Sequence, residues 1–218
     1  MSDQEIHSRI RGARTDYVAP ALDDSRLDAD PFRQFLTWYE AATAAGIAEP
    51  NAMTVSTVGA GGMPDARVLL LRGFSSAGFQ FFSSSTSAKG RQLAAGSAAA
   101  IVFYWDALHR QVRVRGRVRV LPEADAAAYW ATRPRESQIA AWASAQSSIV
   151  ESRAALEASF AECAGRFQDG EVPPPPDWTG YAVMPSEIEF WQGREHRLHD
   201  RIRYRLEAGG WIRERLAP

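Results

Sequence analysis

The stretch QVRVRGRVRV, Gln111 to Val120, decides the fold class because its side chains alternate between two kinds. Valine occupies positions 112, 114, 118 and 120, while glutamine or arginine occupies each odd position from 111 to 119. Successive side chains of a β-strand point to opposite faces of a sheet, so this period of two predicts a strand with one apolar and one polar face.

Short strands are predicted on both sides of this stretch, because brief apolar runs are separated there by turn residues. They cover residues 53–58, 66–72, 79–82 and 100–105. A C-terminal hairpin is expected from residues 201–207 and 211–216, joined by a glycine-containing turn.

Helices are predicted in the connections between these strands. Asp30 and Pro31 mark the start of one helix, and Gly46 marks its end. Its expected apolar face is Phe32, Phe35, Leu36 and Tyr39. Further helices are expected at residues 88–96, 122–132, 137–144 and 149–167, and residues 173–176, four prolines, form a stiff connector.

Cys163 is the single cysteine, so no internal disulfide can form. It falls on the apolar face expected for the last helix, which is Ile149, Leu156, Phe160, Cys163 and Phe167. Free cysteines are usually buried and inert, and this pattern indicates a structural role.

Together these elements predict an α+β, mostly β fold, an antiparallel barrel with helical insertions. Neither G-x-G-x-x-G nor a P-loop follows a strand, which argues against a doubly wound sheet. Residues 1–29 are charged and without periodicity, so we expect a mobile arm there and a single domain over residues 30–218.

Composition restricts the classes of function. The net charge is −1, which argues against a generally basic nucleic-acid binder. No apolar run approaches the ~18 residues that a membrane span needs. The first residues are polar without an apolar secretion signal, so we expect a soluble, cytoplasmic protein with no membrane or nucleic-acid partner.

Lys89 is the single lysine among 25 basic residues, and it follows a run of serines. Together with Arg67, the hydroxyl groups of residues 83–87 and the N–H groups of a helix start, it would form an anion site suited to a phosphate. The alternative is a solvated basic loop.

A second anion site is suggested by Tyr129, Arg133 and Ser137, which are spaced at i, i+4 and i+8. They would share a helix face, although Pro134 is expected to bend that helix. The alternative is a surface ion-pair cluster of Arg133 with Glu136 or Asp125.

The C-terminal stretch EHRLHDRIRY contains His196 and His199, but no further ligand cluster accompanies them, so we expect no metal site. If the stretch is a strand, its basic side chains share one face and its apolar side chains share the other. The basic face is Arg197, His199, Arg201, Arg203 and Arg205, and the apolar face is Leu198, Ile202, Tyr204 and Leu206.

Several stretches together resemble the pyridoxine (pyridoxamine) 5'-phosphate oxidase family. They are RVLLLR (67–72), SAKGRQL (87–93), RQV (110–112), RPRESQIAAWASAQSS (133–148), IEFWQG (188–193), RLHDRIRY (197–204) and RLAP (215–218). The resemblance implies an FMN-binding split β-barrel, a homodimer with FMN at the subunit interface. It also implies oxidation of pyridoxine or pyridoxamine 5'-phosphate to pyridoxal 5'-phosphate, with O2 as acceptor and H2O2 as product.

The resemblance also assigns residues to the two ligands. The FMN positions are Arg67, Val68, Leu69, Leu70, Leu71, Arg72, Phe82, Ser83, Lys89, Gln111, Gln146, Ser147, Trp191 and Arg201. The substrate positions are Arg14, Tyr17, Arg72, Tyr129, Arg133, Ser137, Arg197 and His199, of which Arg197 and His199 are the catalytic candidates. We expect Arg201 to reach the flavin, and Arg203 and Arg205 to form surface or interface ion pairs.

Two positions depart from the family pattern. Arg72 stands where lysine is usual, which retains the charge but changes the geometry of a phosphate contact. Ala88 stands where many members have a second basic residue, which leaves more of the FMN phosphate to Arg67 and Lys89.

Two other functions compete with this hypothesis. One is a phenazine-pathway flavin oxidase, which shares the SxKGR loop and the terminal region but acts on a tricyclic substrate. The other is a non-catalytic carrier of flavin or pyridoxal phosphate. The set of Tyr129, Arg133 and Ser137 favours the phosphorylated vitamer.

Overall fold

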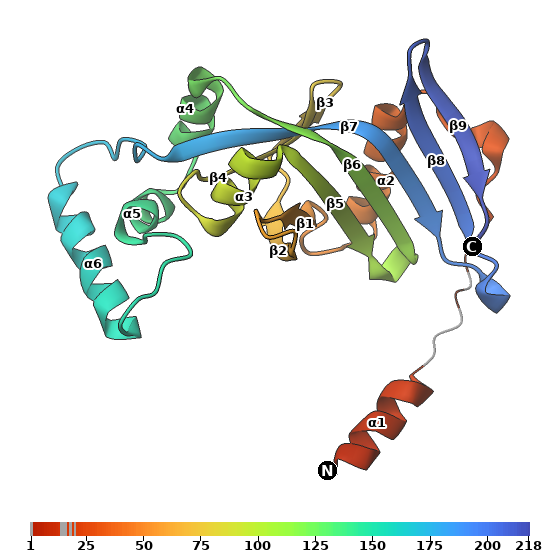
Figure 1. Ribbon diagram of the computed structural model, residues 1–218, viewed down its shortest axis with the longest axis horizontal. Coiled ribbons are helices and arrows are strands. Elements are labelled where there is room, and N and C mark those ends of the chain that lie inside the picture. The colour runs from red at the N-terminus through yellow and green to blue at the C-terminus, as the bar shows by residue number, and fades with distance from the viewer. Residues whose placement is uncertain (1, 14–16, 18, 20) are drawn as a thin grey trace. The chain divides into compact units, whose positions relative to one another are not determined.

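The computed structural model describes residues 2–13, 17, 19 and 21–218 (Figure 1). Its helices in this part of the chain are α1 (Asp3–Gly12), α2 (Pro31–Ala44), α3 (Ala88–Gly96), α4 (Glu123–Ala131), α5 (Arg135–Ala143) and α6 (Arg153–Arg166), with short turns η1 (Asp24–Arg26), η2 (Asp106–Leu108) and η3 (Glu195–Arg197). Its strands are β1 (Ala52–Val58), β2 (Pro64–Leu70), β3 (Gly73–Ser75), β4 (Gly78–Ser84), β5 (Ala98–Trp105), β6 (Arg110–Val120), β7 (Trp178–Gln192), β8 (Asp200–Glu207) and β9 (Gly210–Leu216). The α+β, mostly β class is confirmed.

The chain divides into two compact units. The barrel unit comprises Asn51–Phe103 and Val114–Glu187. The hairpin unit comprises the described residues up to Pro50, together with Tyr104–Arg113 and Ile188–Pro218. Strands β5, β6 and β7 contribute residues to both units. The division expected between residues 29 and 30 stays a prediction.

The strands are hydrogen-bonded in the order β2-β1-β5-β6-β7-β4-β3, and β8 pairs with β7 and with β9. The β1–β2, β1–β5, β3–β4, β4–β7 and β8–β9 pairs are antiparallel. Strand β6 has the predicted alternation, but its valine face is buried only in its first half. Val112 and Val114 are inaccessible, whereas Val120, at the end of the strand, is 65% exposed.

Aromatic side chains dominate the core of the barrel unit. The ring centroid of Phe79 lies 6.1 Å from that of Phe74 and 6.3 Å from that of Phe103. Phe81 stacks on Tyr181 at 5.4 Å. Each fully buried ring of this kind contributes roughly 1.5–3 kcal/mol of transfer free energy, so these strands are joined by packing as well as by hydrogen bonds.

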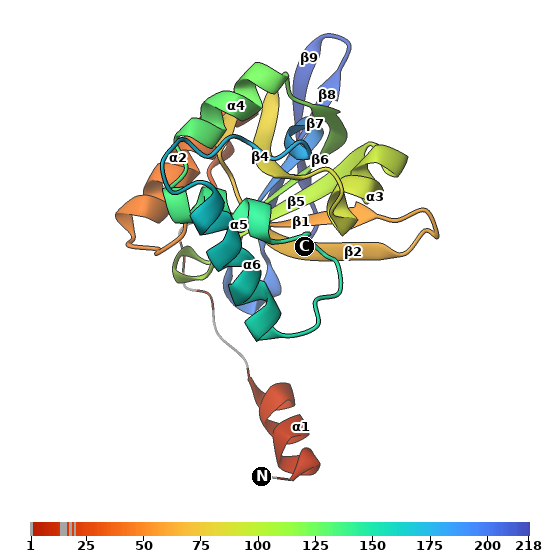
Figure 2. The same cartoon turned by 90° about the vertical axis from the view of Figure 1, so that its left-hand side faces the viewer.

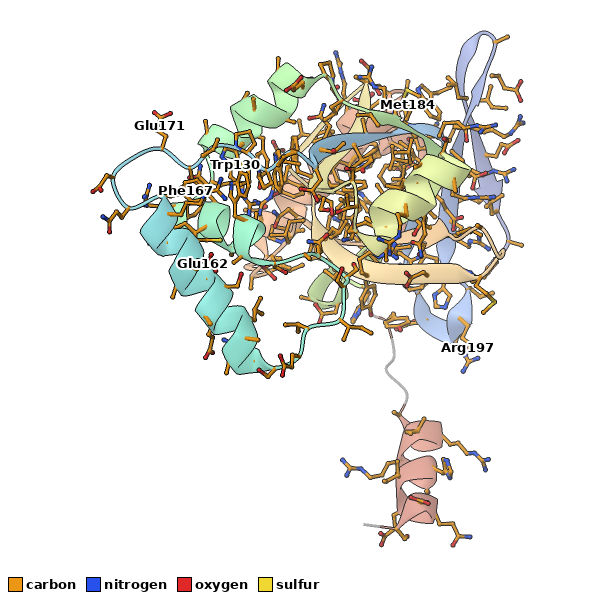
Figure 3. The ribbon with its side chains drawn as sticks, turned by 60° about the vertical axis from the view of Figure 1, so that its left-hand side comes forward. Trp130, Glu162, Phe167, Glu171, Met184 and Arg197 are labelled. Carbon is orange, nitrogen blue, oxygen red and sulfur yellow. The ribbon has the colours of Figure 1, made fainter. Side chains whose placement is uncertain are left out.

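A second apolar cluster of the barrel unit lies beside α5 and α6, which run next to each other (Figure 2). Its buried members are Trp130, Ile139, Phe167 and Val172, and Trp130 and Phe167 are labelled in Figure 3. The Trp130 indole N–H donates to the Val172 carbonyl at 2.7 Å, which joins α4 to the segment after α6.

Helix α6 begins later than the sequence pattern predicts. The hydroxyl of Ser152 accepts from the Ala155 N–H at 3.0 Å and caps the helix, whereas Ile149 lies before the cap and is fully exposed. The expected apolar face therefore loses its first member. Cys163 is half-buried against the second cluster, as a packing role requires.

Helix α2 begins and ends where predicted, because the Asp30 carboxylate accepts from the Phe32 N–H at 2.9 Å and Pro31 occupies the first turn. Its expected apolar face is partly wrong, since Leu36 is 41% exposed. The buried stripe is Pro31, Gln34, Phe35, Trp38 and Ala42. This stripe is rotated about the helix axis relative to the expected face, because Trp38 packs edge-on against Phe190 of β7, with ring centroids 5.1 Å apart.

The β8–β9 hairpin forms as predicted, with Glu207 opposite Gly210 across a two-residue turn. Its buried face is Ile202 and Tyr204, whereas Leu198 and Leu206 are exposed. The apolar face expected for this stretch is thus limited to its middle.

Part of the expected arm is attached to this hairpin. Arg215 donates to the Leu22 carbonyl and Arg213 to the Leu27 carbonyl, each at 3.0 Å, and the Tyr204 hydroxyl donates to the Asp28 carbonyl at 2.7 Å. Helix α1, which the sequence pattern did not predict, is stabilised by a capping box and buries none of its residues. Among the described residues, no helix is long and apolar enough to cross a membrane.

Candidate functional site

Lys89 lies in the first turn of α3 and is the centre of a group that we call the lysine cluster, Ser83, Ser87, Lys89 and Gln146. The Ser87 hydroxyl caps α3 by accepting from the Gly90 N–H at 3.2 Å. A Cβ at position 90 would overlap the carbonyls of the preceding serine loop, so glycine is needed for this close approach. The resulting tight turn places Lys89 beside the end of β4.

The Lys89 ammonium group is held by neutral oxygens. Its Nζ lies 2.7 Å from Gln146 Oε1, 3.2 Å from Ser83 Oγ and 3.5 Å from Ser87 Oγ. Lys89 is only 7% exposed, and its pKa is lowered by burial and then by the charge of Arg67, with Asp65 opposing. Within the described part of the chain it forms no salt bridge. A buried ammonium group in such surroundings fits an anionic ligand.

Arg67 differs from Lys89 because one of its partners is a carboxylate. Its guanidinium donates to the Val55 carbonyl at 3.0 Å and to the Thr57 hydroxyl at 2.7 Å, and it forms a 2.6 Å salt bridge with Asp65. The Asp65 side chain is exposed, so solvent screens this pair and weakens it. An incoming phosphate can therefore compete for Arg67.

The remaining positions of the RVLLLR stretch follow from the β1–β2 ladder. Val68, Leu69 and Leu70 pair with Thr54, Met53 and Ala52, respectively. Leu71 and Arg72 lie beyond the end of β2, and the Arg72 N–H donates to the Gln80 carbonyl at 2.9 Å.

A second group, which we call the aromatic cluster, contains Phe82, Tyr129 and Trp178 with the guanidinium groups of Arg72 and Arg133. The rings of Phe82 and Tyr129 stack at 4.1 Å and 15°. Trp178 is nearly parallel to both, at 6.1 and 6.3 Å. The Arg72 guanidinium carbon lies 5.6 Å from the Tyr129 ring centroid, within reach of a cation–π contact.

Arg133 lies between α4 and α5, because Pro134 ends the first helix and begins the second, as expected from the sequence. Its guanidinium carbon is 4.6 Å from the Trp178 ring centroid and 5.5 Å from that of Trp130, and it donates to the Ser137 carbonyl at 2.8 Å. Its Nε is buried and, among the described residues, has no hydrogen-bond partner. An unpaired donor on a cation is what an anion site requires.

A third group, the histidine cluster, lies in the hairpin unit and contains Tyr17, His109, Trp191 and His199. The Tyr17 ring centroid is 4.6 Å from His109, 5.8 Å from Trp191 and 5.7 Å from His199, and Trp191 is 4.8 Å from His199. No sequence motif marked His109. Its Nδ1 is buried and has no hydrogen-bond partner within the described residues.

The electrostatics of His199 indicate a neutral ring at neutral pH. Burial, and then the charge of Arg197, lower the pKa of His199 below its ordinary 6.5. Its Nδ1 accepts from the Arg194 N–H at 3.1 Å, so that nitrogen carries no proton. The neutral ring therefore carries its proton on Nε2, which can donate to a ligand.

The prediction that Arg197 and His199 continue the face of a strand is wrong. Residues 195–197 form a turn in which His196 and Arg197 have left-handed backbones, with φ of 56° and 61°. Strand β8 begins only at Asp200. Arg197 projects from this turn (Figure 3), so its direction is set by the turn and not by the alternation of β8.

Arg201 is engaged by an acidic residue of the neighbouring strand. Its Nε lies 2.8 Å from Glu189 Oε1 and its Nη2 lies 3.2 Å from Glu189 Oε2, while Arg113 contacts Oε2 at 3.0 Å. Hydrogen bonding to Glu189 raises the pKa of Arg201. The ion pairs expected for Arg203 and Arg205 are present, both with Glu214.

Three predicted site residues make no close contact to these groups or cannot be described. Gln111 is half-buried on β6, and Ser147 is exposed in the loop after α5 with φ of 69°. Arg14 lies outside the described residues. Among the residues that the structure describes, no three His, Cys, Asp or Glu side chains form a group able to hold a metal ion.

The arrangement can bind anions and planar rings. The lysine and aromatic clusters of the barrel unit each contain a cation, and the aromatic and histidine clusters present ring faces. No activated serine or cysteine nucleophile is among them. The chemistry that suits such groups is binding and orientation of a cofactor and a phosphorylated substrate.

Comparison with known proteins gives two family matches. The family described as pyridoxamine 5'-phosphate oxidase matches residues 39–167. The family described as the C-terminal dimerisation region of pyridoxine 5'-phosphate oxidase matches residues 178–218.

Curated relatives match over nearly the whole chain. The pyridoxine/pyridoxamine 5'-phosphate oxidase of Rubrobacter xylanophilus is 48% identical over 209 residues, 96% of this chain and 96% of the relative. That of Ralstonia pickettii is 50% identical over 211 residues, 96% and 99% of the two chains.

Solved structures show the same fold. PhzG from Burkholderia lata, solved with tetrahydrophenazine-1-carboxylic acid, superposes with a TM-score of 0.86 at 29% identity and covers 92% of this chain and 99% of its own. An FMN-binding protein of Nostoc punctiforme related to pyridoxamine 5'-phosphate oxidase gives 0.69 at 18% identity, with 88% and 100% covered. The fold is the expected split β-barrel.

Proposed function

The chain belongs to the pyridoxamine 5'-phosphate oxidase family, and we propose that it oxidises pyridoxine 5'-phosphate and pyridoxamine 5'-phosphate to pyridoxal 5'-phosphate. The cofactor is FMN, and oxygen is the proposed electron acceptor, with hydrogen peroxide as product. The observation that carries the proposal is the presence of two separate cationic clusters in the barrel unit, centred on Lys89 and Arg133, because this reaction requires two phosphates to be held.

The residues present fit FMN. Lys89 is a buried cation surrounded by the neutral oxygens of Ser83 and Gln146, which suits a phosphate monoester. Arg67 can exchange its exposed partner Asp65 for the same phosphate. Bound there, FMN would supply two-electron redox chemistry between the substrate and oxygen.

The substrate phosphate is assigned to the aromatic cluster. Arg133, which donates to the Ser137 carbonyl, supplies the positive charge, and the hydroxyl groups of Tyr129 and Ser137 are assigned to the same phosphate. Arg72 lies over the Tyr129 ring and adds a second positive charge. These residues hold the substrate in a fixed orientation, which lowers the entropic part of the barrier.

Arg197 and His199 orient the pyridine ring in this proposal. His199 keeps its proton on Nε2 because its Nδ1 accepts the Arg194 N–H, so it can donate a hydrogen bond to a substrate oxygen. Burial, and then the charge of Arg197, lower the pKa of His199. A homodimer and a cytoplasmic location are further parts of the proposal, and the match to a dimerisation region supports the former.

The similarity to PhzG favours one alternative, a flavin oxidase acting on a tricyclic substrate. The ligand solved with PhzG carries a carboxylate and no phosphate, so selectivity for phosphorylated substrates distinguishes the two functions. A non-catalytic carrier of flavin or pyridoxal phosphate is the other alternative.

An aerobic assay of the purified protein with FMN tests these functions. Formation of pyridoxal 5'-phosphate is followed by absorbance and hydrogen peroxide by a coupled peroxidase, with each phosphorylated vitamer and with unphosphorylated pyridoxine as the matched control. Turnover of the phosphorylated vitamers alone is expected. Loss of flavin absorbance on anaerobic addition of pyridoxamine 5'-phosphate excludes a carrier, whereas equal turnover of pyridoxine would contradict the assignment of Arg133.

A further inference from the structure

Asp177 and Trp178 stand at the start of β7, directly after the four prolines. The resemblance assigns neither residue to a ligand. Asp177 contacts the serine loop that leads to the lysine cluster, whereas Trp178 belongs to the aromatic cluster and contacts Arg133.

Asp177 anchors three consecutive residues of the serine loop. Its Oδ2 accepts from the Ser84 hydroxyl and, at 2.8 Å, from the Thr86 hydroxyl. Its carbonyl accepts from the Ser85 N–H at 2.8 Å. One residue therefore holds both the backbone and the side chains of the loop between Ser83 and Lys89.

The serine loop is connected by hydrogen bonds to the lysine cluster. The Ser87 hydroxyl donates to the Ser84 carbonyl at 2.7 Å, and the same hydroxyl caps α3 and lies beside Lys89 Nζ. Release of Ser84 would thus loosen the helix cap that places Lys89. Burial raises the pKa of Asp177, but the hydrogen bonds from Ser84 and Thr86 hold it below its ordinary value, so the anchor is ionised.

The negative charge of Asp177 does not neutralise the anion site. The charges that act on Lys89 are those of Arg67 and Asp65. The hydroxyls of the loop take up the Asp177 carboxylate instead. Asp177 therefore acts on Lys89 through geometry and not as its counter-ion.

Trp178 acts on the other cluster through its ring face. The Arg133 guanidinium carbon lies 4.6 Å from its centroid, and the indole plane is within 11° of the Tyr129 ring. The indole N–H donates to the Ala126 carbonyl of α4 at 3.2 Å, which fixes the orientation of that plane. Trp178 therefore limits the positions that Arg133 can adopt.

We infer that Asp177 and Trp178 are positioning residues for two different phosphates, Asp177 for that of FMN and Trp178 for that of the substrate. The inference rests on the proposed function of the two clusters. Asp177 ends the turn before β7 and Trp178 begins the strand, and each side chain has its own set of contacts. We therefore expect substitution of Asp177 to weaken FMN binding without raising the KM for substrate, and substitution of Trp178 to do the reverse.

The first test measures binding of FMN and of riboflavin, which lacks the phosphate, to apo-protein carrying Asp177→Ala. Riboflavin serves as the probe for phosphate-independent binding. We expect the Kd for FMN to rise about tenfold, the factor that corresponds to one hydrogen bond to a charged group, while the Kd for riboflavin stays unchanged. Asp23→Ala is the matched control, because Asp23 also accepts from a serine hydroxyl but lies in the hairpin unit.

A second variant guards against misfolding. Ser84→Ala combined with Thr86→Val removes the two donors and keeps the carboxylate, and it should produce the same selective loss of FMN affinity. If both variants keep the wild-type ratio of FMN to riboflavin affinity, Asp177 does not position the phosphate loop. If the wild-type protein itself shows no preference for FMN over riboflavin, the assignment of the lysine cluster fails, and this inference with it.

The second test measures steady-state kinetics of the FMN-loaded enzyme with Trp178→Leu. We expect the KM for pyridoxamine 5'-phosphate to rise about fivefold from the lost cation–π contact, with kcat and the Kd for FMN unchanged. Trp142→Leu is the matched control, because the Trp142 indole also donates to a backbone carbonyl and also lies under an arginine, Arg166, at 4.9 Å. Trp178→Phe keeps a ring face and should restore most of the KM.

The outcomes separate the inference from the function on which it depends. An unchanged KM in Trp178→Leu, in a protein whose KM does rise in Arg133→Leu, overturns the role of Trp178 and leaves the substrate site intact. An unchanged KM in Arg133→Leu overturns the substrate site itself. Equal losses in Trp178→Leu and Trp142→Leu would show that Trp178 has only a packing role.

Discussion

Replacing Arg201 by leucine tests how much the ion pair with the buried carboxylate of Glu189 contributes to the stability of the hairpin unit. Glu189 has only 4% of its side chain exposed, and Arg201 binds it through two nitrogen–oxygen contacts of 2.8 and 3.2 Å. The substitution leaves this carboxylate with Arg113 alone, at 3.0 Å. An ionised group that loses a partner in a buried position is strongly destabilised.

The size of the effect follows from the exposure of the two arginines. Removing one partner of a fully buried pair costs about 3–5 kcal/mol. Arg113 remains bound and the Arg201 side chain is 26% exposed, so we expect the free energy of unfolding to fall by about 2 kcal/mol. For a chain of this length this corresponds to a decrease in Tm of about 4–8 °C.

The assay is thermal and urea unfolding of the apo-protein, at one fixed protein concentration, so that loss of cofactor does not contribute. Arg203→Leu is the matched control on the same strand, because its partner Glu214 is more exposed and keeps Arg205. We expect that variant to lose less stability than Arg201→Leu, because solvent screens an exposed ion pair. Adding Glu189→Gln to Arg201→Leu should restore part of the stability, since it removes the unpaired charge.

The reasoning is refuted if Arg201→Leu apo-protein unfolds within 1 °C of Arg203→Leu, where ~4–8 °C is expected. A fall in FMN affinity without that loss of stability would mean that Arg201 acts on the flavin alone. A fall in both would mean that its pairing with Glu189 and its assigned role at the flavin coexist.

Four further predictions follow from single residues. Lys89→Ala should raise the Kd for FMN about ten- to a hundredfold in fluorescence titration of the apo-protein, because it removes the buried cation of the lysine cluster. Arg133→Leu should raise the KM for phosphorylated substrate and leave the flavin content unchanged. The NMR titration midpoint of His199 should lie below 6.5, so its contribution to stability is present above pH 6.5 and decreases as the pH falls from there towards the folded-state pKa. Gly116→Ala should destabilise the barrel unit by about 3 kcal/mol in urea unfolding, because a Cβ there would overlap the carbonyl of Met184, labelled in Figure 3.

Each of these predictions has a contradicting result. An unchanged FMN affinity in Lys89→Ala would remove the lysine cluster from the cofactor site, and loss of flavin in Arg133→Leu would mean that the two phosphate sites are exchanged. A His199 midpoint at or above 6.5 would contradict the lowering of its pKa by burial and by the charge of Arg197. Gly165→Ala, where no atom lies within 4 Å of the added carbon, is the control for Gly116→Ala, and equal stability of the two would refute the overlap.

Local sequence rules were sufficient for the elements whose signals lie within a few residues. The alternation in β6, the Asp30 cap of α2, the helix break at Pro134 and the glycine-containing turn of β8–β9 all occur as predicted. Each depends on the pleat of a strand, on the geometry of a single cap or on the missing N–H of proline. The family resemblance added the cofactor and the substrate, which none of these signals contains.

The tertiary structure decided which partner each charged side chain has. Arg67 and Arg201 are both arginines in predicted strands, yet one pairs with an exposed Asp65 and the other with a buried Glu189. Lys89 is distinguished in the sequence by composition alone, and its neutral surroundings depend on Gln146, which lies 57 positions away. The turn that redirects Arg197, and the contacts of Asp177 and Trp178 to two clusters, likewise require distant segments to meet. A pattern in the sequence determines which side chains share a local face, whereas the strength of an ion pair depends on distance and burial, which only the fold sets.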